Sequence, residues 1–213
     1  MWEIRFPVQE YALITSLQKS HFRGAIVSSD YKSLKFKAES IQSYADFRSN
    51  YVGKLPLILA AKLVAGLAQQ LDAIQQATRH TIIGFTPEHV IVINGTTFAY
   101  LGCEFVSKIE GEHVTICSPF NVYDFFAAPE LVKITELPST AHYRAAYFSI
   151  ACFSLYAICN DKTFYQNYLM NQASNLRDIY NCLNNLSFKN TKLYWLLSRC
   201  LDEQPENRSI YFI

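Results

Sequence analysis

The spacing of hydrophobic residues in the first forty positions predicts one helix and two short strands. In "VQEYALITSLQKS", Tyr11, Ile14 and Leu17 recur at helical intervals. "GAIVSS" and "SLKFKAES" are then two short apolar runs, separated by the turn-prone "SSDYKS". This part of the chain is therefore expected to contain both kinds of element.

The middle of the chain predicts a long helix followed by a hairpin. "LPLILAAKLVAGLAQQLDAIQQATRH" places Leu63, Leu67, Leu71 and Ile74 on one stripe, and Pro56 lies near its start, where a missing N–H costs least. "HVIVING" and "TTFAYLG" are two strand-like runs joined by Asn-Gly, a dipeptide typical of tight hairpin turns. A long irregular stretch is expected from there to about residue 138.

The last third of the chain is predicted to be helical. An apolar helix is expected from Ala145, and "NLRDIYNCLNNL" and "KLYWLLSRCL" predict two more. No internal repeat, low-complexity segment or Gly/Ser linker divides the chain. The predicted order is a helix, two strands, helices, a hairpin, a long loop and further helices, which is an α+β pattern.

Composition and charge narrow the classes of partner. The chain has 213 residues, of which 50% are hydrophobic and 17% charged, and its net charge is +1. This balance gives no electrostatic reason to expect nucleic acid as a partner. The basic run "YKSLKFK" is better explained as the exposed face of one strand. No apolar run reaches the roughly 18 residues of a membrane span, and "MWEIRFPVQE" lacks the apolar core of a signal peptide. The longest apolar candidate is residues 145–159, so no membrane partner is expected.

The cysteines and histidines do not predict a metal site. Six cysteines are scattered without a CxxC pair, and Cys152 and Cys159 would share one face of a buried helix. His113 and Cys117 are four residues apart but lie in a loop-like stretch without obvious further ligands, and we interpret them as ordinary residues. These cysteines fit a reducing, cytoplasmic location. No metal or cofactor is expected.

Four short motifs, in order along the chain, resemble motifs of the protein kinase family. "TPEHVIVI" is similar to the end of the kinase catalytic loop, usually written KPENILI, and "AAPE" matches the motif that closes the activation segment. "YFSIACFSLYAI" is similar to the central buried helix of the family, and "LLSRCLDEQPENR" resembles its late CLxxxPxxR pattern. The likeness extends over nearly the whole chain.

The resemblance implies a kinase-like fold with a reduced N-terminal lobe. "QEYALITSLQKSHFRGAIV" is similar to the regulatory helix and the strand after it, with Glu10 at the helix glutamate and His21 at the family's histidine. Residues 1–40 would form a truncated N-terminal lobe, with this helix and about two strands. Residues 41–213 would form a mainly α-helical C-terminal lobe. If the chain begins at Met1, no room remains for the three strands that hold the glycine-rich loop and the phosphate-binding lysine.

The same comparison implies that the catalytic residues are missing. The catalytic-loop aspartate falls at Gly84, the metal-binding asparagine at His89 and the second metal-binding aspartate at Gly102. A register shifted by two residues places Glu104 at this last position instead. Glycine cannot accept a proton, and a neutral imidazole is a poor ligand for Mg²⁺. The resemblance therefore implies a catalytically inactive kinase, or pseudokinase, and no enzyme activity.

Some structural features of the family are expected to remain. The glutamate of the APE motif, Glu130, and the late arginine, Arg208, would form an ion pair, whereas the aspartate that starts the central helix falls at Ala146. The alternative to a buried ion pair is that both charges lie on the surface, where such pairs contribute little to stability. After Arg208 only "SIYFI" remains, which would expose Tyr211 and Phe212 as an apolar contact site.

These observations favour a non-catalytic kinase-like protein that binds other proteins, as a scaffold or as a regulatory subunit of a larger assembly. With 15 Phe and 14 Tyr, aromatic side chains are available for such contacts. One alternative is a divergent nucleotide-dependent phosphotransferase that uses Glu104 and Glu88. Another is a helical structural protein whose kinase likeness is coincidental. A structure that lacks the hairpin between Val90 and Leu101, or that holds Glu130 far from Arg208, would favour it.

Overall fold

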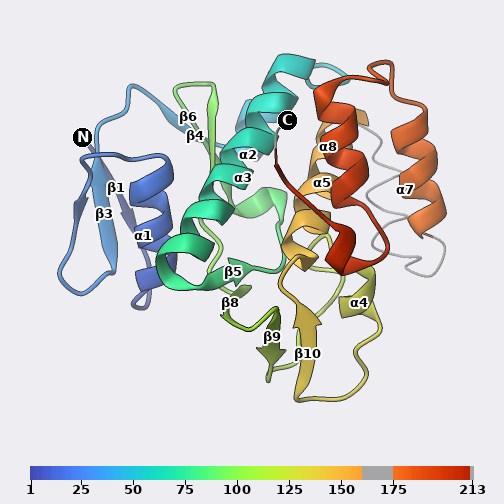
Figure 1. Ribbon diagram of the computed structural model, residues 1–213. Helices are drawn as coiled ribbons and strands as arrows, with labels where there is room; N and C mark the ends of the chain where they lie inside the picture. The colour runs from blue at the N-terminus through green and yellow to red at the C-terminus, as the bar shows by residue number, and fades with distance from the viewer. Residues whose placement is uncertain (160–174, 212–213) are drawn as a thin grey trace.

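Helix α3 (Leu57–Thr78) is the central element of the computed structural model, which describes residues 1–159 and 175–211. Helix α1 (Tyr11–Ser20) packs against it on one side and α5 (Ala145–Cys159) on another (Figure 1). The described residues contain seven helices and three small antiparallel sheets, so the expectation of an α+β protein is confirmed. The remaining helices are α2 (Tyr44–Ser49), α4 (Pro129–Val132), α7 (Asn175–Asn184) and α8 (Lys192–Cys200), with short 3-10 turns η1 (Pro87–His89) and η2 (Pro205–Asn207).

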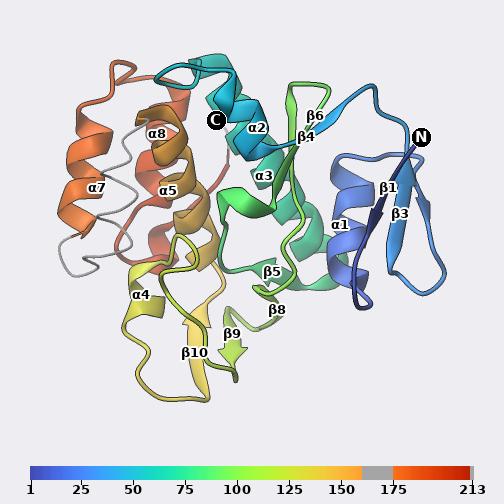
Figure 2. The ribbon, with the colours of Figure 1, turned by 180° about the vertical axis from the view of Figure 1, so that it is seen from behind.

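The first sheet lies at the N-terminal end of the molecule, beside α1 (Figures 1 and 2). Its strand order is β1-β3-β2, formed by β1 (Trp2–Arg5), β3 (Ser33–Phe36) and β2 (Ile26–Val27). Leu34 and Phe36 are buried while Lys35 between them is exposed, as the period of two along a strand requires. The interpretation of the basic run as one exposed strand face is therefore confirmed.

Strand β1 corrects the expectation of about two strands in this region. Glu3 and Arg5 alternate with apolar residues in β1, but the segment is only four residues long and gives little periodic signal. Its pairing with β3, from Trp2 opposite Phe36 to Arg5 opposite Ser33, stabilises it as a strand. The predicted order, which began with a helix, is therefore wrong at this point, because β1 precedes α1.

The predicted hairpin is present in the second sheet. Strands β6 (Val90–Ile93) and β7 (Thr97–Tyr100) pair in register from Val90–Tyr100 to Ile93–Thr97, and β4 (Ile41–Ser43) adds to the other edge of β6. Asn94 and Gly95 both have positive φ, 50° and 67°, as a type I′ turn requires. The hairpin and the Asn-Gly turn predicted from the sequence are therefore confirmed.

The stretch expected to be irregular contains two of the four strands of a third sheet, β8 (Val106–Glu110) and β9 (His113–Ile116). Its strand order is β10-β9-β8-β5, and the other two strands are β10 (Ser139–His142) and β5 (His80–Ile82). The turn between β8 and β9 contains Gly111 at φ 64°, with Glu110 and Glu112 exposed on either side, as expected of a solvated turn. The strands were missed because they are short and alternate charged with β-branched residues around loops.

The two most apolar helices form the core. Helix α5 is buried almost all round, including Ala146 and Cys152, as an apolar helix without a polar face should be. Helix α3, rather than the expected residues 145–159, is the one helix among the described residues that is long and apolar enough to cross a membrane. However, 56% of its apolar window is buried inside the protein, and core helices of soluble proteins commonly pass the same test.

Candidate functional site

An open pocket of about 420 Å³ lies where the kinase resemblance places the catalytic loop. It brings together residues from the loop after β5, from η1 and from two later loops. The lining residues are Thr86, Glu88, His89, Glu104, Phe105, Tyr123 and Asp124. Three residues singled out from the sequence, Glu88, His89 and Glu104, thus share one pocket. Tyr123 and Asp124 were not predicted, because they fall in the stretch expected to be irregular.

The pocket is acidic. Its lining includes three exposed carboxylates, Glu88, Glu104 and Asp124, and no lysine or arginine lines it among the described residues. The Nδ1 atom of His89 lies 3.4 Å from Oε2 of Glu104, and the His89 ring stacks on Tyr100 with 5.9 Å between ring centroids. A highly negative ligand would meet repulsion here.

Glu10, at the N-terminal end of α1, adds a further acidic group beside this pocket. Burial raises the pKa of its carboxyl, the neighbouring Cys103 thiol partly opposes the rise, and the charge of Glu104 adds to it. No ion pair with Lys or Arg is present for Glu10 in the part of the chain that the structure describes. The glutamate expected to hold a phosphate-binding lysine thus faces other acids instead.

Gly84 is packed so tightly that no side chain fits. It is buried between Ile83 and Phe85, and an added Cβ would overlap the ring of Phe125. Its backbone does not have positive φ, so the requirement for glycine at this position is one of space. The position at which the family comparison expects a catalytic aspartate is therefore filled by a neighbouring phenylalanine.

Gly102 is enclosed in a similar way. An added Cβ would overlap Nδ1 of His89 and the hydroxyl of Tyr100. The described residues contain no group of three or more His, Cys, Asp or Glu side chains placed to hold a metal ion.

Two buried polar side chains hold the backbone around the pocket. The Ser149 hydroxyl on α5 accepts a hydrogen bond of 2.8 Å from the Phe85 N–H. The Gln70 amide on α3 accepts from the Tyr100 N–H and donates to the Tyr100 carbonyl, both at 2.8 Å. The family comparison places a missing aspartate at Ala146, but it does not identify Ser149, three residues later, as the residue that binds the loop after β5. The only signal was a serine within an otherwise apolar helix.

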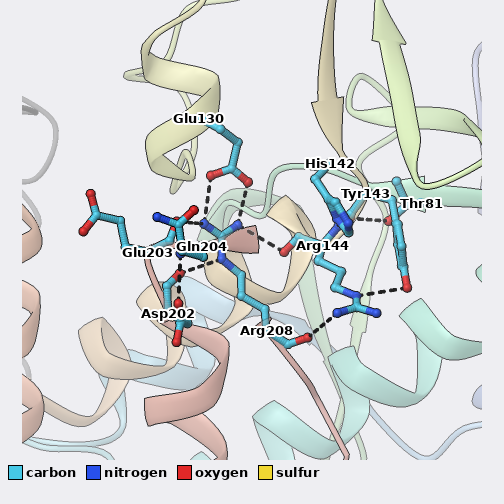
Figure 3. A network of polar contacts seen from close by, with 9 residues as sticks. All are labelled: Thr81, Glu130, His142, Tyr143, Arg144, Asp202, Glu203, Gln204 and Arg208. Carbon is cyan, nitrogen blue, oxygen red and sulfur yellow. Dashed lines mark hydrogen bonds and ion pairs between the residues drawn. The ribbon is translucent and has the colours of Figure 1, made fainter. Parts of the chain in front are cut away.

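The structure also brings Glu130 and Arg208 together, although 77 residues separate them in sequence. Arg208 is fully buried, and its Nη1 and Nη2 atoms donate to Oε1 and Oε2 of Glu130 at 2.5 and 2.8 Å (Figure 3). Its Nε donates to the Asp202 carbonyl at 2.8 Å, and the guanidinium lies 5.1 Å from the ring centre of Phe148. The pair thus joins α4 to the segment after η2 and to α5.

Arg144 extends this network towards β10. Its Nη1 donates to the Arg208 carbonyl and its Nε to the hydroxyl of Tyr143 (Figure 3). The same Nη1 also donates to the Glu206 carbonyl. His142 lies beside it, and burial, followed by the positive charge of Arg144, lowers the pKa of the imidazole. The network therefore fixes the chain between the third sheet and the C-terminal residues. Sequence reasoning missed Arg144, because nothing in its local pattern marks it.

The other residues singled out from the sequence lie apart from the pocket. His113 is on β9, opposite His142 on β10, and Cys117 is exposed at the end of β9. Tyr211 is 74% exposed, and Phe212 lies outside the described residues.

A scan against models of known protein families finds no match for this chain, and a search of curated proteins finds none either. A function for this chain must therefore be inferred from its own residues and their geometry.

Proposed function

We propose that this protein is a non-catalytic, protein kinase-like module that works by binding other proteins. The motif order supports the proposal. The segment likened to the regulatory helix is α1, the segment likened to the end of the catalytic loop runs from η1 into the β6–β7 hairpin, and the one likened to the central helix is α5. Two findings would have favoured a coincidental likeness, a missing hairpin or a separated Glu130 and Arg208, and neither is observed.

The observation that favours a non-catalytic role is the composition of the pocket. Nucleotide triphosphates are strongly negative, and enzymes that use them supply lysine, arginine or bound Mg²⁺ to balance the charge. This pocket offers three carboxylates and lacks a described group able to surround a metal ion. Gly84 and Gly102, the positions of two expected aspartates, are closed by Phe125 and His89. Losing these groups removes about 2.7–4 kcal/mol of transition-state stabilisation for each one.

The Glu130–Arg208 ion pair supports a structural, non-catalytic role for the proposed kinase-like fold. Arg208 is buried and makes a two-pronged contact with Glu130. Burying a charged pair costs desolvation free energy, so its presence fits a role in holding the surrounding structure in place. Exposed aromatic residues provide candidate contact points, since aromatic side chains are enriched at binding hot spots. Trp195 on α8 is 51% exposed and Tyr211 is 74% exposed. We therefore propose other proteins as partners, within a stable cytoplasmic assembly, rather than nucleic acid or membrane.

A thermal-shift titration tests the proposal. Mg·ATP, Mn·ATP and Mg·GTP at saturating concentrations are expected to leave the Tm unchanged, because a ligand that does not bind the folded state cannot stabilise it. An active protein kinase serves as the positive control. A clear rise in Tm with any of these nucleotides would contradict the proposal. Purification of the protein from its native source should also recover a partner that stays bound at constant stoichiometry through gel filtration.

One observation favours the alternative phosphotransferase: Glu88, Glu104 and Asp124 line the same pocket, and carboxylates are the ligands that Mg²⁺ prefers. If this alternative is correct, nucleotide turnover should be measurable and should disappear in Glu104→Gln. Lys108→Gln, a charge change on β8 outside the pocket lining, is the control and should leave any such turnover intact. If no nucleotide is turned over, the phosphotransferase alternative is excluded and the non-catalytic role is supported.

A further inference from the structure

Strand β1 has one unpaired edge. It pairs with β3, and the strand order β1-β3-β2 leaves its other side without a neighbouring strand among the described residues. In both ribbon views this strand lies at the N-terminal end of the molecule, away from α5, α7 and α8 (Figures 1 and 2). Unpaired strand edges are templates for pairing with another chain.

The backbone groups that face this free edge can be identified from the pairing with β3. The Phe6 N–H donates to the Lys32 carbonyl at 2.8 Å, which continues the register in which Ile4 is opposite Leu34. Because antiparallel strands alternate the residues that bond to one neighbour, Ile4 and Phe6 bond to β3. Glu3 and Arg5 therefore direct their N–H and C=O groups to the free edge.

Only three antiparallel registers of β1 with a second copy of itself use these free groups around a two-fold axis. One centres on Glu3 and places it opposite Glu3 of the second copy; another centres on Arg5 and places two arginines opposite each other. The third centres on Ile4 and places Glu3 opposite Arg5 of the second copy, twice by symmetry. Opposite charges in directly opposed positions stabilise a strand pair, and like charges destabilise it. The charges of β1 thus select one register.

Two further features fit a second copy as the occupant. The Arg5 side chain is 77% exposed, and its contact with Glu3 of the same strand leaves it accessible to a new partner. Edge strands are often protected by charges of one sign, since these repel a second copy. Glu3 and Arg5 have opposite signs and are self-complementary, so they do not give this protection.

We propose that two copies of this chain associate through antiparallel pairing of their β1 strands, with Ile4 at the two-fold axis and Glu3 opposite Arg5 in both halves. The pairing joins two three-stranded sheets into one six-stranded sheet. A four-residue edge gives a reversible, concentration-dependent dimer rather than an obligate one. This inference depends only on the β1 edge and stands or falls separately from the proposed function.

Charge reversal, measured by sedimentation equilibrium over a wide concentration range, tests the inference. Arg5→Glu and Glu3→Arg each place like charges opposite each other and should raise the dimer dissociation constant by roughly tenfold or more. An equimolar mixture of the two variants should form a heterodimer at least as readily as the wild type, because every opposed pair is then opposite in sign. The double variant Glu3→Arg/Arg5→Glu should restore the homodimer.

A backbone variant provides an independent control. Glu3→Pro removes an N–H that β3 does not use, so the fold should persist by circular dichroism and thermal melting while dimerisation is lost. Three results would overturn the inference: a wild-type chain that stays monomeric at every concentration, a dimer insensitive to the single reversals, or reversed variants that do not rescue each other when mixed.

Discussion

The guanidinium of Arg208 and the carboxylate of Glu130 form a two-pronged contact in which the arginine is fully buried and the glutamate side chain is 20% exposed. The two residues come from distant parts of the sequence, so their contact is a property of the folded chain alone. Main-chain carbonyls of Asp202, Glu203 and Arg144 accept the remaining guanidinium hydrogens. The arginine is thus surrounded by acceptors on every side and cannot be removed without leaving them unsatisfied.

Arg208→Ala is expected to lower the free energy of unfolding by about 3 kcal/mol or more, which corresponds to a fall in Tm of about 10 °C. The reason is that Glu130 and several carbonyls lose their donor in a buried setting. Differential scanning calorimetry measures the change. Lys108→Ala, which breaks the Lys108–Glu110 contact between side chains 69% and 65% exposed, is the matched control and should change little. An equal effect of both variants would show that burial is not what gives the Arg208 pair its strength.

Introducing the expected catalytic aspartate at Gly84 should destabilise the protein and should not create kinase activity. The side chain would overlap Phe125 in a buried site, which costs about 1–3 kcal/mol for overpacking before any cost of burying charge. Chemical denaturation measures the loss, and a radiolabelled phosphate assay checks activity. Gly84→Ala should be less costly in a Phe125→Ala background than in the wild type, because the ring that blocks it is gone. Strict additivity of the two changes would contradict the steric explanation.

Ser149→Ala is expected to cost about 1–3 kcal/mol, because the buried Phe85 N–H loses its acceptor. Ser154→Ala is the matched control: its hydroxyl is equally buried on α5 but donates only to the Ile150 carbonyl one turn earlier in the same helix. That carbonyl already serves the helix, so this variant should have a much smaller effect. Urea denaturation of both variants distinguishes them. If both variants lose a similar free energy of unfolding, the hydrogen bond between α5 and the pocket loop does not contribute specifically to stability.

His21 should make stability depend on pH in the acidic range. Burial lowers the pKa of its imidazole to about 4, and the nearby Gly66 carbonyl offsets this only in part. The unfolded chain then binds a proton at higher pH than the folded chain does. Stability from this residue is therefore complete above pH ~6.5 and is lost as the pH falls towards ~4, by on the order of 2–3 kcal/mol.

His21→Gln should flatten this part of the stability profile, since glutamine takes up no proton. The difference between wild-type and variant unfolding free energies, measured from pH 7 to pH 4, isolates the histidine from the carboxylates that titrate in the same range. Parallel profiles over that interval would rule out the buried imidazole as the cause.

The sequence predicted well wherever a local pattern has a single physical solution. Asn94-Gly95 permits the positive φ angles of a tight turn, so the hairpin could be predicted directly. The stripe of Leu63, Leu67 and Leu71 likewise predicted the long buried helix α3. In both places, local chemistry and tertiary packing require the same conformation.

Prediction failed where distant residues decide the structure. Strand β1 is too short to show a period and is defined by its pairing with β3. Phe125 closes the space at Gly84 from a segment that had no regular pattern, and Ser149 binds Phe85 across 64 positions. Contacts of this kind leave no local trace in one sequence. The acidic character of the pocket could be anticipated only as far as Glu88 and Glu104, because Asp124 comes from that same segment.

The double contact of Gln70 with the backbone of Tyr100 has a mechanical consequence. One amide side chain binds both the N–H and the C=O of a strand residue, and Gly66 lets the main chain at Phe98 approach the same helix, so β7 is held to α3 at two neighbouring points. A swing of the hairpin away from α3 would break both of these hydrogen bonds. The N-terminal sheet is linked to this hairpin through the main chain, because the Asn94 side chain accepts the N–H groups of Glu39 and Ser40 between β3 and β4.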